Sequence, residues 1–179
     1  MSVALLELRE LGPQDEPDLV TLFERCDDFF ALCYGLSPGP EEAERALAEL
    51  PPGSRARDKT LYGIYLTGEI MGVAEAVRGF PDPDTVLMGL LMLSPEARSR
   101  GLGSDVLASF VARWEREGFQ RVRAGVSDAN ERARSFLQAH GFDPVAHHIR
   151  QHGDTERGVT VMIRELHPED VQPETQPHA

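Results

Sequence analysis

The hydrophobic pattern of the first sixty residues predicts a short strand and two helices. Residues 3–9 form a short strand-like run, and apolar residues then recur at helical spacing over residues 19–33. Gly35 is expected to end that helix, because glycine readily closes a last helical turn. A second helix is expected over 40–50, since proline suits the first helical position. The polar and basic residues 51–59 are expected to form a mobile loop.

The middle of the chain predicts a hairpin followed by a buried strand. Residues 61–66 and 70–77 flank the turn at 67–69, which is a hairpin signal. Residues 85–93 then form one continuous apolar run, as is typical of a strand buried on both faces. These segments therefore predict three strands.

The second half of the chain alternates between helices and strands. Residues 101–117 place large apolar side chains on one helical face, and 121–127 reads as the next strand. A short helix is expected over 130–140. Residues 142–150 and 159–166 then predict a final antiparallel strand pair.

The order of these elements predicts an α/β (α+β) fold. The strand-helix-strand order from 85 to 127 implies a right-handed crossover and parallel pairing of its two strands, whereas the two hairpins imply antiparallel pairing. The sum is a mixed, mostly antiparallel sheet of about seven strands with about four helices. One domain is expected over residues 1–167, and the proline-rich, acidic residues 168–179 are expected to be a disordered or extended tail.

Length and composition place the chain among ordinary globular proteins. It has 179 residues, of which 41% are hydrophobic and 27% charged, which fits one domain with a substantial core. No apolar run approaches the roughly 20 residues that span a bilayer, and the N-terminus lacks the pattern of a signal peptide. Cys26 and Cys33 share one predicted helical face, so they are expected to fill an apolar surface in a cytoplasmic protein.

Charge and histidine patterns argue against two classes of ligand. With 30 acidic and 18 basic residues the net charge is −12, so nonspecific nucleic-acid binding is disfavoured. A negative field attracts cations such as a polyamine, an amino sugar or a lysine side chain, although solubility is the simpler explanation. A zinc site is not expected, because His147 and His148 are adjacent on a predicted strand and no cysteine pair accompanies them.

The residues that connect the strand at 85–93 to the following helix predict a phosphate site. Unpaired N–H groups at a helix start carry partial positive charge and attract phosphate. Gly101 and Gly103 allow the backbone to approach oxygen atoms closely, and Arg98 and Arg100 add positive charge. The spacing matches neither a nucleoside-triphosphate loop nor Gly-x-Gly-x-x-Gly. A pyrophosphate is therefore the expected ligand, and an ordinary helix start is the alternative.

Two blocks of residues together resemble the GNAT acetyltransferases. The first, Arg98-x-x-Gly101-x-Gly103, is preceded by a strand and a proline and resembles that family's coenzyme A motif. The second resembles the family's second motif and reads Asn130-x-x-Ala133-x-x-Phe136-Leu137-x-x-x-Gly141-Phe142. The blocks have the family's order and separation, and the predicted elements follow its plan. The chain is therefore identified as a member over nearly its whole length.

The resemblance implies an acetyl-coenzyme A site where the central parallel strands splay apart. Backbone groups of Met92 and Leu93 would hold the pantetheine arm and the acetyl carbonyl. The Asn130 side chain would hydrogen-bond the pantetheine, although it also suits the N-cap of its helix, and Leu137 would lie beside the coenzyme. The pyrophosphate would be wrapped by a run of consecutive residues: Arg98, Ser99, Arg100, Gly101, Leu102, Gly103 and Ser104.

The chain departs from the family pattern at two positions. The family often has glycine where Ser99 stands, but serine keeps the backbone N–H. The position of Leu137 is commonly tyrosine, which protonates the departing thiolate, and leucine cannot donate a proton. Either another group or water serves instead, or the reaction tolerates the loss, or activity is weak. Because a thiol has a pKa of about 8.5, a thiolate leaves fairly readily.

The base that takes the proton of the amine is expected among nearby acids. Some family members use a glutamate at the position of Gly125, which has no side chain. Glu75 is the candidate instead, because an acid within an otherwise apolar strand is unusual; a structural salt bridge or an edge position is the alternative. Asp28, Phe29 and Asp82 are expected to line the acceptor pocket.

The sequence therefore predicts an N-acetyltransferase that moves an acetyl group from acetyl-coenzyme A to a primary amine by direct attack. A small cationic metabolite is the expected acceptor. The first alternative is an acetyltransferase that acts on a protein N-terminus or a lysine. The second is an acyl-coenzyme A-binding module with little catalysis, which fits Leu137. No metal, nucleic-acid or membrane partner is expected, and a homodimer is one option for the oligomeric state.

Overall fold

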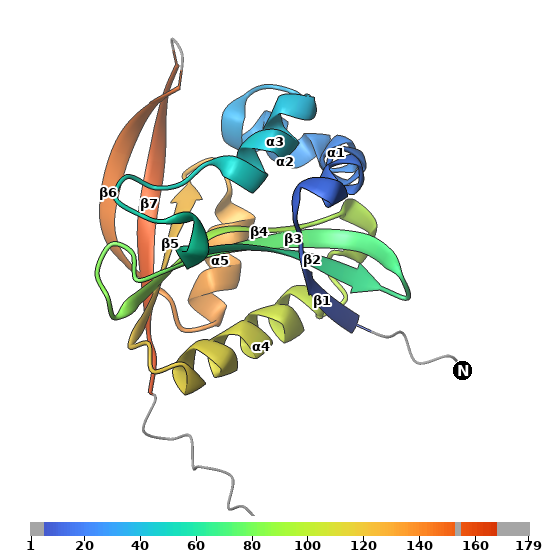
Figure 1. The fold of residues 1–179 in the computed structure, drawn as a ribbon. Helices are drawn as coiled ribbons and strands as arrows, with labels where there is room; N and C mark the ends of the chain where they lie inside the picture. Colours follow the sequence, from blue (N-terminus) through green and yellow to red (C-terminus); the bar gives the residue numbers. More distant parts are fainter. Residues whose placement is uncertain (1–5, 153–154, 168–179) are drawn as a thin grey trace, which may run out of the picture.

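A computed structural model describes residues 6–152 and 155–167 of the chain, and Figure 1 shows its elements. Within this part, the strands of the sheet are β1 (Leu6–Glu10), β2 (Lys59–Leu66), β3 (Glu69–Arg78), β4 (Thr85–Leu93), β5 (Arg121–Ser127), β6 (Asp143–His152) and β7 (Thr155–Glu165). The helices are α1 (Glu16–Arg25), α2 (Asp27–Tyr34), α3 (Pro40–Ala48), α4 (Leu102–Arg116) and α5 (Glu131–Ala139). Short 3₁₀ turns are η1 (Pro13–Asp15), η2 (Ala56–Asp58) and η3 (Pro95–Ala97).

The sheet has seven strands in the order β1-β2-β3-β4-β5-β7-β6 among the described residues. In this sheet β4 and β5 form the parallel pair, and the other neighbours are antiparallel. The predicted mixed, mostly antiparallel α/β (α+β) sheet is therefore confirmed. The first strand is described only from Leu6, and the predicted tail at 168–179 lies outside the described residues.

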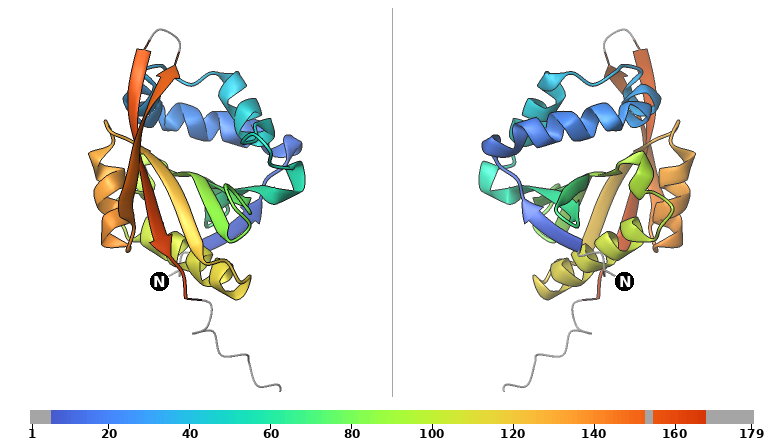
Figure 2. Two further views of the ribbon diagram at one scale, coloured as in Figure 1. Left: turned by 90° about the vertical axis from the view of Figure 1, so that its left-hand side faces the viewer. Right: turned by 90° about the vertical axis from the view of Figure 1, so that its right-hand side faces the viewer.

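Helices cover both faces of the sheet, as Figures 1 and 2 show. On one face α1, α2 and α3 form a core in which Leu22 and Phe30 pack with Val73 of β3. On the other face α4 and α5 form a second core, which includes Phe110 and Trp114. The sheet is thus held by a separate apolar layer on each side, as its amphipathic helices require.

One predicted helix is in fact two helices. The apolar spacing over 19–33 predicts one continuous helix, but α1 ends at Arg25 and α2 begins at Asp27. Cys26 lies between them with φ −101° and ψ 24°. Asp27 and the acid after it then start a new helix, where negative charge is favourable. The apolar positions stay in phase across this break, so periodicity alone does not reveal it, and the described chain has five α-helices rather than about four.

The predicted mobile loop at 51–59 is wrong at its C-terminal end. Residues 56–58 form the 3₁₀ turn η2, and Lys59 is the first residue of β2. The Lys59 side chain is only 6% exposed, and its Nζ donates to the carbonyl oxygen of Glu49 at 2.6 Å. Lys59 is fixed because its ammonium group finds partners inside the fold.

The hairpin of β6 and β7, called the arm from now on, extends past the sheet beside α2 (Figures 1 and 2). The predicted final strand pair is confirmed, and the two strands are longer than the sequence indicates. Arg157 of β7 ties the arm to α2, because its Nη1 donates to the carbonyl oxygen of Leu32 at 3.4 Å. The arm and α2 therefore face each other.

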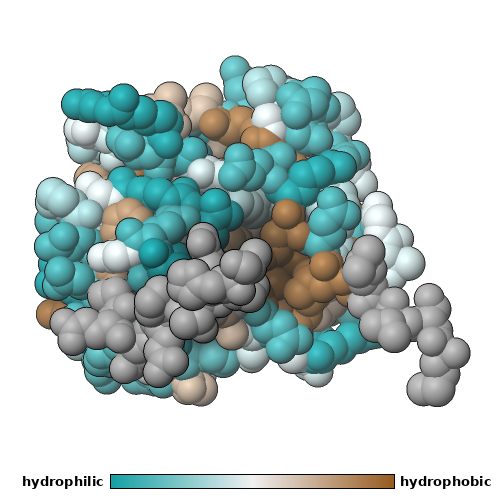
Figure 3. Space-filling view, turned by 60° about the horizontal axis from the view of Figure 1, so that its bottom comes forward, coloured by the Kyte–Doolittle hydropathy of each residue, from teal (hydrophilic) through white to brown (hydrophobic). Residues whose placement is uncertain are grey.

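Figure 3 brings the lower side of Figure 1, where α4 lies, toward the viewer. The surface there is mostly hydrophilic, and its apolar areas lie between polar side chains. In the part of the chain that the structure describes, none of the helices combines the length and the apolar character needed to cross a bilayer.

Candidate functional site

The two parallel strands separate halfway along β4. Pairing between β4 and β5 covers 85–88 and 121–124 and then stops. Beyond this point residues 90–93 of β4 remain paired with β3. An opening in the hydrogen-bond ladder therefore lies between residues 89–93 and 125–127, which matches the predicted splay. This feature is called the opening below.

A β-bulge at Gly89 lies where the strands part. Glu75 of β3 is opposite Leu90, and its neighbour Ala76 is opposite Met88, so Gly89 is the extra residue. A Cβ atom at position 89 would collide with Oε1 of Glu75. Because Gly89 has no side chain, the Glu75 carboxylate can reach the backbone at the edge of the opening.

An ion pair holds Glu75 in this position. Its Oε2 lies 2.9 Å from Nζ of Lys59, and the Glu75 side chain is 18% exposed. The carboxylate is therefore largely enclosed and still open to a small ligand. The salt bridge that the sequence left as an alternative is present, while a role of Glu75 as the base stays a prediction.

The loop between η3 and α4 has the backbone geometry of an anion site. Ser99 and Gly101 both adopt left-handed conformations, with φ of 61° and 82°. The N–H groups of the first two residues of α4 donate to no acceptor among the described residues. A Cβ atom on Gly103 would lie 3.5 Å from Phe136 Cζ and 3.6 Å from Leu93 Cδ1, so a small residue fits and a large one does not. The residues present suit a phosphate-bearing ligand.

Ser99 occupies a position whose backbone conformation glycine adopts more readily than serine. A left-handed φ favours glycine, which accounts for the glycine that the resembled family often has there. The Ser99 hydroxyl accepts a hydrogen bond from Nη2 of Arg132 at 2.9 Å, and this bond ties the loop to α5. Arg100 is exposed beside it. The hydroxyl therefore gives the serine a contact that glycine would lack.

Arg98 is occupied by protein partners. Its Nη2 donates to Oδ1 of Asp28 at 3.0 Å, and its Nε donates to the carbonyl oxygen of Leu93 at 2.8 Å. The guanidinium group lowers the pKa of the Asp28 carboxyl by hydrogen bonding and by its charge. From the sequence, Arg98 is expected to bind the pyrophosphate and Asp28 to line the acceptor pocket. In the structure these two side chains form a pair, which links α2 to the end of β4.

Replacing Asp28 by Asn is expected to remove a small, pH-dependent part of the stability. Because the pKa of Asp28 is lowered in the folded chain, ionised Asp28 stabilises the fold at neutral pH, and this contribution is lost as the pH falls below about 4. Its side chain is 57% exposed, so the effect is expected to stay below about 1 kcal/mol. Urea unfolding from about pH 7 to 3 should show the two free energies of unfolding converging in acid. A difference independent of pH would contradict the pairing.

Asn130 lies where the start of α5 meets α2. Its Oδ1 accepts from the N–H of Ala133 at 3.0 Å, so the N-cap interpretation is confirmed. Its Nδ2 lies 3.7 Å from Sγ of Cys33. Leu137, about two turns further along α5, is 4% exposed and belongs to the core that contains α4. Leu137 therefore packs as a core residue.

The other predicted site residues divide into two groups. Met92 and Leu93 end β4 at the opening, and Phe29 of α2 packs edge-on against Phe30, with ring centroids 5.5 Å apart. Asp82 precedes β4 at the strand end away from the opening, and its Oδ1 lies 3.1 Å from Nη2 of Arg121. The structure does not bring Asp82 to the opening, because β4 is extended and separates them.

Tyr34 joins the site although the sequence did not single it out. Desolvation raises the pKa of its phenol, and the neighbouring Cys33, Glu42 and Glu75 add to this, whereas Arg150 opposes it. The Tyr34 side chain nevertheless keeps 41% of its surface exposed. Tyr34 therefore lies within electrostatic range of both Glu75 on β3 and Arg150 on the arm. One tyrosine at a helix end has no motif, so only the tertiary fold reveals it.

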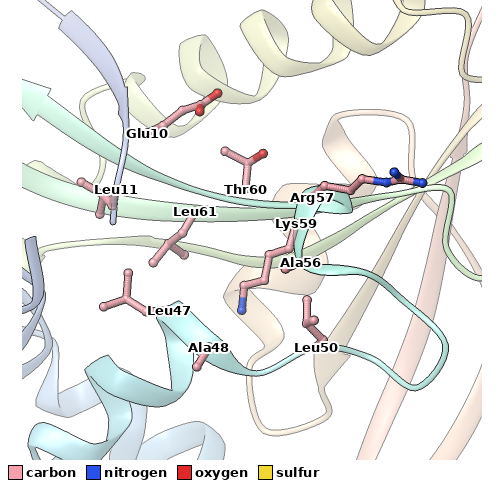
Figure 4. A pocket seen from close by; sticks show the side chains of 10 residues that line it. All are labelled: Glu10, Leu11, Leu47, Ala48, Leu50, Ala56, Arg57, Lys59, Thr60 and Leu61. Carbon is pink, nitrogen blue, oxygen red and sulfur yellow. The ribbon is translucent and has the colours of Figure 1, made fainter. Parts of the chain in front are cut away.

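A cavity of about 360 Å³ lies beside the ion pair of Glu75 and Lys59 (Figure 4). In Figure 4 the Lys59 side chain points toward α3, whereas Thr60 points the other way. Lys59 thus belongs both to the cavity wall and to the ion pair. The lining residues are Glu10, Leu11, Leu47, Ala48, Leu50, Ala56, Arg57, Lys59, Thr60 and Leu61.

Metal-ligating side chains do not gather at this site. Across the described residues, no group of three or more His, Cys, Asp or Glu is placed to hold a metal ion. His147 instead pairs with Asp128, with Nε2 and Oδ2 2.6 Å apart.

The sequence and the fold of this chain are similar to those of known acetyltransferases. Residues 20–142 match the family model described as "Acetyltransferase (GNAT) family". An acetyltransferase from Thermus thermophilus has a similar structure, with 28% sequence identity, a TM-score of 0.74 and coverage of 93% of this chain and 100% of that one. No curated protein matches the chain in sequence.

Two structures of lower identity share the fold. The ribosomal-protein-S18-alanine N-acetyltransferase from Escherichia coli is 13% identical, with a TM-score of 0.68 over 97% of this chain and 100% of that one. A GNAT-family acetyltransferase from Streptococcus pneumoniae is 19% identical, with a TM-score of 0.66 over 91% of this chain and 100% of that one. At these identities the likeness concerns the fold and says nothing of the acceptor.

Proposed function

Since the chain belongs to the GNAT family of acetyltransferases, we propose that it transfers the acetyl group of acetyl-coenzyme A to a primary amine by direct attack. The observation that carries this proposal is the opening between β4 and β5, with the Glu75 carboxylate at its edge. The proposed acceptor is a small amine that is cationic until it loses a proton. The net charge of −12 supports this choice.

Acetyl-coenzyme A would supply an acetyl group already activated as a thioester. The free N–H groups at the start of α4 and the exposed Arg100 would bind its pyrophosphate, and Gly103 would leave room for it. The edge of Met92 and Leu93 that faces the opening would bind the pantetheine arm much as a strand binds its neighbour. These residues would therefore fix the acetyl group at the opening.

Glu75 is the proposed base. The bulge at Gly89 admits its carboxylate to the opening, and Lys59 fixes its orientation. A carboxylate in this position would hold the ammonium group and accept the proton that the amine must lose before attack. Backbone N–H groups along the free edge of β4 would stabilise the negative charge that develops during transfer.

The two cysteines support direct attack over a covalent acetyl-cysteine route. Cys26 and Cys33 are buried, and burial raises the pKa of both thiols. A raised pKa keeps a thiol protonated, and the protonated form is a poor nucleophile. An amine that attacks directly needs neither residue.

A panel of acceptors tests this proposal against its two alternatives. Thiol release from acetyl-coenzyme A is followed with small amines, with lysine peptides and with peptides that have a free N-terminus. Release with small amines is the expected result. Release with peptides alone would favour a protein acetyltransferase. Saturable binding without release on any acceptor would favour the binding module, a role that the buried Leu137 permits.

Two substitutions separate the capping role of Asn130 from a role in binding. Asn130→Ser keeps a capping oxygen but removes the amide, whereas Asn130→Ala removes both. We expect Asn130→Ala to lower the free energy of unfolding by about 1 kcal/mol and Asn130→Ser by less. Both should weaken acetyl-coenzyme A binding about tenfold, because each loses a hydrogen bond to the pantetheine. Calorimetric affinities that match the unsubstituted chain would limit Asn130 to capping.

A further inference from the structure

The face of the arm that turns toward α2 carries positive charge in a chain whose net charge is −12. Residues directly opposite each other in a sheet share a face, so the pairing of β5, β6 and β7 identifies the residues on it. They include His148 and Arg150 of β6 and Arg157 of β7. In the outer part of this face, residues 146–150 and 157–161, the remaining side chains are Ala146, Val159 and Val161, and none is acidic. Asp143 and Glu165 share the face at its base.

Two contacts confirm which way this face points. Arg157 donates to the carbonyl oxygen of Leu32 on α2. On the opposite face, Thr160 lies across from Val126, which belongs to the core of α4 and α5. The basic residues of the arm therefore lie on its side toward α2, and Figures 1 and 2 show the arm beside that helix.

Arg150 is the residue of this face whose charge is available. Arg157 already donates to α2, whereas Arg150 is exposed and forms no ion pair or hydrogen bond with any described residue. Its positive charge acts on the phenol of Tyr34 and lowers the pKa of that group, against the larger effect of desolvation. Arg150 is paired with Arg157, which contacts Leu32 two residues before Tyr34, so Arg150 lies on the part of the arm next to Tyr34. It has no carboxylate partner among the described residues.

Glu75 acts on the same phenol from the other side of the opening. Its charge raises the pKa of Tyr34, and it stands on β3, whereas Arg150 stands on β6 at the far edge of the sheet. The opening between β4 and β5 separates these two parts of the sheet. An acceptor beside Tyr34 would therefore meet a carboxylate on one side and the guanidinium of Arg150 on the other.

We propose that the acceptor is an amine that also carries an anionic group, and that Arg150 binds this group. The ammonium end would face Glu75, and the carboxylate or phosphate end would face Arg150. The inference rests on the proposed function and narrows its substrate class. It excludes simple polyamines, because a second ammonium group would lie against Arg150.

Paired probes that differ in one anionic group test this assignment. The pairs are β-alanine with β-alaninamide, and phosphoethanolamine with ethanolamine. We expect the member with the anionic group to have, in at least one pair, a KM about 10- to 100-fold lower than the member without it, as for a hydrogen-bonded charge. Arg150→Gln should abolish this preference while leaving unchanged the KM of the amines without an anionic group and the acetyl-coenzyme A affinity.

A matched control and a binding measurement complete the test. Arg116→Gln changes another exposed arginine, on α4, and should leave every KM unchanged. Calorimetry with N-acetyl-β-alanine and its amide measures recognition of the anion without turnover. We expect tighter binding of the acid, and we expect Arg150→Gln to remove the difference.

The outcomes separate this inference from the proposed function. If amines without an anionic group are acetylated as efficiently as those with one and Arg150→Gln changes no KM, the assignment of Arg150 is overturned and acetyl transfer stands. If no amine is acetylated, the proposed function fails, and the calorimetric comparison alone decides the role of Arg150. If Arg150→Gln weakens acetyl-coenzyme A itself, Arg150 belongs to the coenzyme site and the inference is overturned.

Discussion

Replacing Glu75 by Gln is expected to lower kcat about 100-fold or more and to leave acetyl-coenzyme A affinity unchanged. General bases contribute roughly 100- to 10,000-fold to a rate, and glutamine cannot take up a proton although it can still accept a hydrogen bond from Lys59. The Glu75 carboxylate lies at the bulge of Gly89. The loop that is expected to bind the pyrophosphate is a different segment, residues 98–104. Turnover and coenzyme affinity should therefore respond separately. Steady-state kinetics and calorimetry measure the two.

A second strand glutamate controls for the loss of one negative charge from the sheet. Glu7→Gln alters an exposed glutamate of β1 and should leave kcat unchanged. Thermal unfolding of Glu75→Gln shows whether the weakened ion pair with Lys59 has disturbed the fold. A folded Glu75→Gln protein with normal kcat across the pH range would remove Glu75 from the role of base.

Replacing Gly103 by Leu is expected to weaken acetyl-coenzyme A binding about 10- to 100-fold. The first N–H groups of α4 have no protein acceptor among the described residues, and a phosphate would accept from them. A leucine side chain would collide with Phe136 and Leu93 if it turned toward them. It is therefore expected to occupy the space in front of these N–H groups. Loss of one or two hydrogen bonds to a charged group accounts for the expected size. Isothermal titration with acetyl-coenzyme A measures it.

Gly103→Ala is the matched control for this substitution. Its Cβ atom would lie at ordinary contact distance, 3.5 Å from Phe136 Cζ, so binding should fall by less than about threefold. Gly103→Leu and Gly103→Ala are both compared with the unsubstituted chain by thermal unfolding. If folded Gly103→Leu binds acetyl-coenzyme A as tightly as the unsubstituted chain, the loop is not the phosphate site.

Local patterns in the sequence predicted most of the fold. The strand at 85–93, the strand at 121–127 and the helix that follows Gly101 occur where periodicity and glycine place them. The split at Cys26 was missed because the apolar face stays in phase across the break. Lys59 was missed because the burial of a lysine depends on a partner in another strand, here Glu75, and no local pattern contains that information.

The candidate site was predictable on its coenzyme side and much less so on its acceptor side. The loop at 98–104 and the N-cap at Asn130 are local features, so short motifs reveal them. Arg98 and Asp28 lie far apart in sequence, so no local pattern predicts their pairing, and the roles expected of both stay predictions. Tyr34 and Arg150 come together only because the arm lies beside α2, and a contact of this kind has no sequence signature.

The proposed product of this chain is an N-acetylated amine formed from acetyl-coenzyme A. The most direct test incubates the full chain with acetyl-coenzyme A and a mixture of small primary amines, and follows the products by mass spectrometry together with free thiol. We expect at least one amine to gain an acetyl group on nitrogen, in step with thiol release. Saturable binding of acetyl-coenzyme A with no acetylated amine in the mixture would contradict it.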